Sequence, residues 1–235
     1  MKSWTLAAAA ALALAACSQP ANTTTEPPPA AVEVSVPSGE YPLDPNHTTV
    51  IVRAKHFGLS YYQFRFNTVS GSLNFNAEAP EQSSVTATID TTSLDTPYSG
   101  DRNFDAELQN SDWLDSASFP TATFTSTAVE RTGPNTARVT GDLTIKGQTH
   151  PITLEVTYNM SHASHPMGFP MQLIGFSARG SFNRAAFGIA STTLMPSAPD
   201  AGDGVSNEIE LVIEAEFMRE APSPAPAPQP AEPVN

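Results

Sequence analysis

The sequence has few cysteines, few basic residues and no long hydrophobic run. One cysteine among 235 residues, at position 17, excludes an intramolecular disulfide and a cysteine-rich zinc site. Eleven Lys and Arg stand against 24 Asp and Glu, a formal net charge of −13. This balance argues against nucleic-acid binding, which requires clustered basic residues to neutralise phosphates. The apolar run Leu6–Ala16 is too short for a transmembrane helix, which needs about 20 residues.

The N-terminus has the features of an export signal. Lys2 precedes the Ala/Leu run, which has the length and flanks of a secretory signal. The run ends in Leu14-Ala15-Ala16-Cys17, which resembles the lipobox of bacterial lipoproteins. The resemblance implies cleavage of residues 1–16 and diacylglycerol on the Cys17 thiol, and the alternative is an ordinary signal followed by a chance cysteine. Because Ser18 rather than Asp follows, it also implies a periplasmic protein anchored to the outer membrane.

The remaining chain divides by composition into a central domain with proline-rich ends. Residues 17–38 and 221–235 together hold 11 of the 22 prolines. Such segments favour extended polyproline conformations and cannot bury a core. We therefore expect a lipid-anchored tether over 17–38, one folded domain over 39–220 and a disordered tail over 221–235.

The domain shows the period-two alternation of apolar and polar residues that is typical of β-strands. About eight such segments are joined mostly by short turns, and the pattern predicts an all-β, extended eight-stranded antiparallel barrel. One helical excursion is expected within 100–110, with Asp101 as its cap. Gly71, Gly141 and Gly180 either enlarge the interior or mark bends and bulges. The predicted strands cover 48–56, 62–75, 85–90, 122–130, 136–146, 152–158, 176–182 and 209–217.

Signals for chemistry are weak. The chain has no Gly-x-Ser-x-Gly elbow, no His-Glu-x-x-His and no phosphate-binding glycine loop, so we expect no enzyme, no catalytic residue, no metal ligand and no cofactor. One alternative is copper binding by a Met/His loop, which otherwise provides adaptable packing. His47 and His56 bracket a strand and are expected to be structural, with His56 also a candidate ligand contact. The loop contains Met160, His162, His165, Met167 and Met171.

Seven motifs, in this order and spacing, resemble the YceI family of bacterial envelope proteins, over about residues 39–218. They are YPLDPNH at 41–47, HFG at 56–58, GSLNF at 71–75, IDTTSLDT at 89–96, FPTATFTS at 119–126, GDLTIKGQT at 141–149 and FNRAAFG at 182–188. The resemblance implies a lipocalin-like barrel that binds long polyisoprenoid chains. Many members carry Arg-Asp-x-His-Leu in the helical excursion, where this chain has Phe-Asp-Ala-Glu-Leu at 104–108. Members are also commonly soluble, so the Cys17 anchor is a second departure.

These observations lead to one expected function and two alternatives. We expect a lipid-anchored periplasmic protein that sequesters or carries an isoprenoid or similar long-chain amphiphile. The alternatives are an envelope-stress or cell-wall interaction protein with a packed barrel, and the copper-binding protein. Polar contacts to the ligand are expected from His56 and Arg184. The apolar lining is expected from Phe75, Ile89, Phe124, Leu143, Leu154, Phe176 and Leu211.

Overall fold

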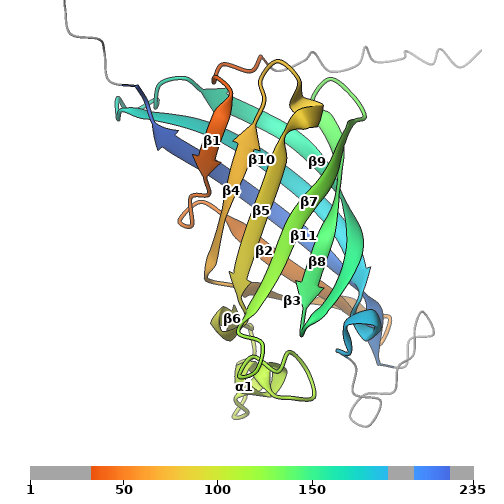
Figure 1. The fold of residues 1–235 in the computed structure, drawn as a ribbon. Coiled ribbons are helices and arrows are strands. Elements are labelled where there is room, and N and C mark those ends of the chain that lie inside the picture. The colour runs from red at the N-terminus through yellow and green to blue at the C-terminus, as the bar shows by residue number, and fades with distance from the viewer. Residues whose placement is uncertain (1–32, 190–203, 223–235) are drawn as a thin grey trace, which may run out of the picture.

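A computed structural model describes residues 33–189 and 204–222, and nearly all of their regular structure is antiparallel β-sheet (Figure 1). The predicted signal peptide, Cys17, and most of the predicted tether and tail lie outside the described residues. Within the described part, no helix is both long and apolar enough to cross a membrane.

The described residues form a single eleven-stranded sheet with little helix. The strand order across the sheet is β1-β4-β5-β7-β8-β9-β10-β11-β2-β3-β6. The helical elements are α1 (Phe104–Gln109) and the short 3-10 turns η1 (Pro80–Gln82), η2 (Thr91–Ser93) and η3 (Arg184–Phe187). The strands are β1 (Gly39–Pro42), β2 (Thr49–His56), β3 (Ser60–Phe66), β4 (Val69–Phe75), β5 (Ser84–Asp90), β6 (Leu94–Asp95), β7 (Thr121–Arg131), β8 (Thr136–Ile145), β9 (Gln148–His162), β10 (Met171–Asn183) and β11 (Val205–Glu220).

The all-β antiparallel prediction is confirmed, but the prediction of a closed eight-stranded barrel is wrong. The sheet is curled and open, with β1 and β6 as its edges. The expected strand over 62–75 is broken, because the backbone N–H of Asn67 donates to the Ser93 carbonyl (3.0 Å) and that of Thr68 to Ser93 Oγ (3.0 Å). β3 then pairs with β2, whereas β4 pairs with β5. The short edge strands β1 and β6 account for the other two strands by which the observed sheet exceeds the prediction.

The segment between β1 and β2 draws one edge of the sheet toward β11. β1 pairs with β4, and one residue later Leu43 forms an isolated antiparallel bridge with Phe217 of β11. The Asp44 backbone N–H then donates to the Glu216 carbonyl (2.8 Å), and β2 continues along β11. Curling therefore creates a concave interior, and Figure 1 shows α1 beyond one end of the strands.

Side-chain alternation lines this interior with apolar groups, as the sequence predicts. On β8, Val139, Leu143 and Ile145 are buried while Asp142 between them is exposed. A large core cluster includes these three residues, and a second cluster gathers around the fully buried Tyr41. The Tyr41 hydroxyl donates to the Pro37 carbonyl (2.7 Å), so burial of this ring leaves no unpaired donor.

The structure corrects the predicted helix cap and decides between the two alternatives for the glycines. The cap of α1 is Asn103, whose side chain accepts from the Ala106 N–H, and not Asp101. Gly71, Gly141 and Gly180 do not line the interior space. A Cβ at Gly141 would lie 2.4 Å from the Phe124 ring, and its partner Ser126 borders a register shift in β7. Close packing beside a bulge, rather than added volume, explains this glycine.

Candidate functional site

The concave side of the sheet encloses a cavity of about 800 Å³. Its wall is built mainly from apolar side chains of nearly every strand, because alternate residues of each strand point to this side. A volume of this size is within the range of ligand pockets, roughly 300–1,000 Å³. The interior is therefore not filled by the protein's own side chains, which the packed-barrel alternative would require.

The structure places all nine residues that the sequence singled out on the wall of this cavity. Whether they contact a ligand stays a prediction. They come from eight different strands and one 3-10 turn: Phe75 on β4, Ile89 on β5, Phe124 on β7, Leu143 on β8, Leu154 on β9, Phe176 on β10, Leu211 on β11, His56 on β2 and Arg184 in η3.

One end of the cavity is bordered by turns. The β4–β5 connection contributes Glu78 and Pro80, and the end of β7 and the turn after it contribute Arg131 and Pro134. Val34, which precedes β1, also lines the wall there and packs on the cluster around Tyr41. This end of the cavity thus lies beside the point where the described chain begins.

The opposite end is bordered by aromatic side chains around α1. The Phe104 ring lies 5.8 Å from the Tyr62 ring and 5.5 Å from the Tyr98 ring, measured between centroids, and all three line the cavity. The Tyr62 hydroxyl oxygen is buried and has no hydrogen-bond partner among the described residues. Sequence reasoning missed this group, because Tyr62 meets Phe104 only through the fold and neither residue carries a local motif for a site.

Arg184 is a buried cation at this same end. Its guanidinium donates to three backbone carbonyls, those of Ser206 (3.0 Å), Ile189 (3.1 Å) and Val205 (3.1 Å). It also lies 5.5 Å from the Trp113 ring centroid. Burial lowers the pKa of Arg184. These bonds join the two sides of the segment 190–203, so Arg184 has a clear structural role alongside its place on the cavity wall.

The Arg and His positions of the family motif are used differently here. Phe104 replaces the arginine and joins the aromatic group, while Glu107 replaces the histidine and forms an ion pair with Arg102. The hydrogen bond between the two side chains is the main reason that the pKa of Arg102 is raised and that the pKa of Glu107 is lowered. Arg102 therefore enters the cavity wall as part of a neutral pair rather than as a free charge.

The Met/His segment runs from the end of β9, which carries Met160 and His162, through the connection with His165 and Met167, to Met171 at the start of β10. Met160 and Met167 are exposed, and the Met167 backbone N–H donates to His165 Nδ1 (3.0 Å). The His165 ring packs edge-on to Phe169 at 4.9 Å. Among the described residues, His162 and His165 do not belong to a group of three His, Cys, Asp or Glu side chains that could hold an ion. Copper binding by this loop stays a prediction.

Comparisons with known proteins agree with this architecture. Residues 41–217 match the family of YceI-like domains. Protein YceI of Escherichia coli O157:H7 is 33% identical over 188 residues, which cover 79% of this chain and 90% of that protein. The crystal structure of Burkholderia cenocepacia BcnA superposes with a TM-score of 0.62 at 26% identity, over 74% of this chain and 98% of that one. A polyisoprenoid-binding domain from Saccharophagus degradans shares the fold at a TM-score of 0.53 and 14% identity, over 77% and 98%.

Proposed function

The chain belongs to the YceI-like family, and from this premise we propose that it is a lipid-anchored periplasmic binding protein for a long-chain amphiphile. The proposed ligand is an isoprenoid or a similar hydrocarbon chain, held in the cavity and carried or sequestered without chemical change. The observation that supports this most directly is the apolar cavity of about 800 Å³.

The energetics of burial favour a hydrocarbon in this space. Each CH₂ group that leaves water contributes roughly 0.8 kcal/mol, so ten such groups provide about 8 kcal/mol before the entropic cost of binding. A net gain of that size corresponds to a Kd of about 1 μM, so a chain with more than ten buried CH₂ groups is needed to offset the entropic cost and reach this affinity. Charged ligands gain little along the wall, because Phe124, Leu143 and Leu154 in its middle offer no hydrogen bonds.

The form of the cavity supports a long ligand. Residues from both ends of the sheet line one continuous space, with Val34 and Pro80 at one end and Trp113 and Arg184 at the other. A chain laid through this space would meet polar groups only near its ends. Selectivity is then set by chain length and by the few polar contacts at those ends.

Anchoring through Cys17 is the second part of the proposal. The lipobox-like sequence supports it, and Val34 at the border of the cavity supports a tether that ends beside one end of that cavity. Expression of the full chain in a Gram-negative host, with Cys17→Ser as the matched variant, tests this part. The parent chain is expected in the outer-membrane fraction and the variant in the soluble periplasmic fraction. The same distribution for both would overturn the anchor.

Native mass spectrometry and lipid extraction of protein purified from bacterial membranes test the binding function. We expect one chain-bearing lipid per protein, and uptake of a prenyl alcohol or a prenylated quinone by the delipidated protein. Protein that is repeatedly empty and that takes up neither prenyl lipids nor fatty amphiphiles would overturn the proposal.

A further inference from the structure

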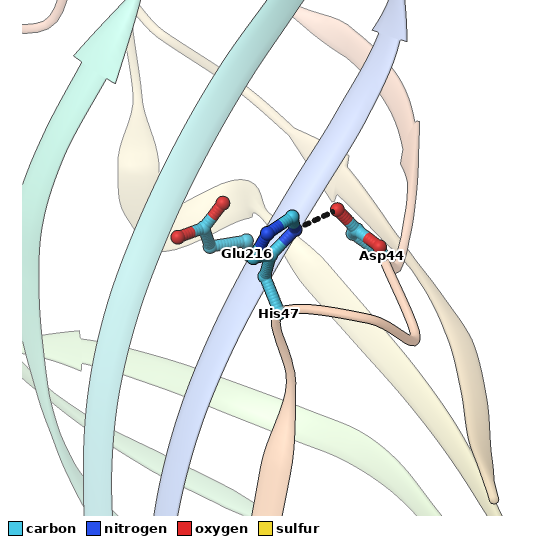
Figure 2. A group of neighbouring side chains, drawn as sticks. All are labelled: Asp44, His47 and Glu216. Carbon is cyan, nitrogen blue, oxygen red and sulfur yellow. Dashed lines mark hydrogen bonds and ion pairs between the residues drawn. The ribbon is translucent and has the colours of Figure 1, made fainter.

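A histidine and two carboxylates meet on the outer surface, away from the cavity. The segment after β1 carries Asp44 and His47, and β11 carries Glu216 (Figure 2). Ala215 and Phe217, on either side of Glu216, line the cavity, so the Glu216 side chain points to the opposite face of the sheet. This group has no part in the ligand cavity.

The backbone holds the two parts of the group together. The Asp44 N–H donates to the Glu216 carbonyl (2.8 Å), and the Glu216 N–H donates to Thr48 Oγ1 (3.3 Å). The bridge between Leu43 and Phe217 lies directly alongside. The Cα positions of Asp44 and Glu216 are therefore set by these backbone bonds, and His47 lies three residues after Asp44 in the turn that leads into β2.

Asp44 is fixed and orients the histidine. It is only 3% exposed, and one carboxylate oxygen accepts the Asn46 backbone N–H (2.9 Å). The other oxygen lies 2.6 Å from His47 Nδ1. A proton on Nδ1 completes this bond and leaves Nε2 as the free lone pair of a neutral imidazole, which is the nitrogen that a metal ion would use.

The His47 ring lies between the two carboxylates, as Figure 2 shows. One ligand atom from each of the three residues lies within 4.8 Å of the others. A zinc ion with bonds of about 2.1 Å places tetrahedral ligands roughly 3.4 Å apart, and the exposed Glu216 side chain can adjust toward His47 Nε2 to reach that spacing. His47 and Glu216 are both exposed, and the entry path for an ion is open.

We propose that His47 Nε2 and the Glu216 carboxylate bind a divalent late transition-metal ion, with Asp44 as the positioning residue behind His47 and water in the remaining positions. Imidazole with carboxylate suits zinc and its neighbours, whereas magnesium and calcium prefer sites made entirely of oxygen ligands. The arrangement of carboxylate, histidine and metal is the usual way in which proteins fix the tautomer and the orientation of a ligating histidine.

The local field also favours a cation here. The hydrogen bond to Asp44 raises the pKa of His47, and the charges of Asp44 and Glu216 add to this effect. The same negative charges that stabilise a bound proton stabilise a bound metal ion, and the two compete for the imidazole.

Titration of the full chain with Zn²⁺ by calorimetry, after treatment with EDTA and removal of lipid, tests the site. We expect one zinc ion per chain at pH 8 and loss of this binding in His47→Ala. Glu216→Gln is expected to weaken it at least about tenfold, and Asp44→Asn about 10–100-fold, as is usual for the loss of an orienting partner. Circular dichroism of each variant shows whether the fold is kept. A change at His47 is the least disruptive to the fold, because its side chain is exposed.

Two controls separate the site from general attraction to an acidic surface. Glu214 lies two residues from Glu216 on the same strand. Glu214→Gln therefore removes the same negative charge but leaves the proposed metal-binding side chains unchanged. His162→Ala combined with His165→Ala removes the other candidate histidines. Both controls are expected to keep the zinc affinity of the parent chain. Undiminished binding in His47→Ala, equal weakening by Glu214→Gln and Glu216→Gln, or no binding by the parent chain would each overturn the proposal.

Discussion

A phenyl ring placed inside the cavity provides the sharpest test of whether the interior is truly free. Ala178 on β10 is 9% exposed and lines the cavity. Ala178→Phe adds a ring at a position where a packed interior has no space. In a packed core such a change forces neighbours to move and lowers the free energy of unfolding by about 1–3 kcal/mol. In a cavity, the added ring instead gains apolar contacts, and burial of a whole phenylalanine side chain is worth about 1.5–3 kcal/mol.

We expect the free energy of unfolding of lipid-free Ala178→Phe to equal or exceed that of the parent chain, with weaker binding of the amphiphile. A ring that takes the place of three chain carbons removes about 2.4 kcal/mol of burial, which is roughly a 60-fold loss of affinity. Urea unfolding followed by circular dichroism gives the stability, and displacement of a fluorescent fatty chain gives the affinity.

Gly141→Ala is the matched control, because it adds a single carbon where there is no room. A Cβ at this position would lie 2.4 Å from the Phe124 ring and 2.6 Å from the Thr125 carbonyl oxygen. We expect this smaller change to lower the free energy of unfolding by about 1–3 kcal/mol. A loss of similar size in Ala178→Phe, or unchanged affinity for the chain, would refute the reasoning that the cavity is the binding site.

Three further predictions address the ligand, the buried cation and a turn. In a series of saturated chains with one head group, each CH₂ removed is expected to weaken binding about fourfold, and a flat series measured by the same displacement assay would contradict burial of the chain. Arg184→Met is expected to lower the free energy of unfolding by about 3 kcal/mol in urea, because the carbonyls of Ile189, Val205 and Ser206 lose their donor; a loss below about 0.5 kcal/mol would show that those carbonyls are satisfied by water. Gly147→Ala is expected to lower the free energy of unfolding by about 1 kcal/mol, since Gly147 has a φ of 73° in the β8–β9 turn. An unchanged midpoint of urea unfolding would contradict strain at this position.

The cavity lining was predictable because each strand carries its own signal. Alternation along β8 or β9 shows which side chains share a face, and apolarity shows which face turns inward. Leu143 and Leu154 could therefore be assigned to the interior before any pairing was known. The number of strands was harder to predict, since the break between β3 and β4 depends on hydrogen bonds from Asn67 and Thr68 to Ser93, about 25 residues away.

The surface group of Asp44, His47 and Glu216 had no comparable signal. Asp44 and His47 are close in sequence, but a spacing of three residues in a loop is common and by itself indicates no metal site. Glu216 lies on β11, where it is one of several alternating acidic residues, and only the contact between Leu43 and Phe217 selects it. Sites of this kind are set by strand pairing between distant segments, and alternation alone cannot predict which strands pair.

Alternation along β11 connects the two proposed sites. Ala215 and Phe217 face the cavity, and Glu216 between them faces the group with His47. Because the strand is pleated, one regular backbone segment places Ala215 and Phe217 on the wall of the amphiphile cavity and the Glu216 carboxylate on the solvent side. The same segment accepts the chain after β1, through the Leu43 bridge and the Asp44 N–H, and so draws that edge of the sheet toward β11. Changes that break this contact should therefore affect both sites, whereas a change confined to the Glu216 side chain should affect the metal site alone.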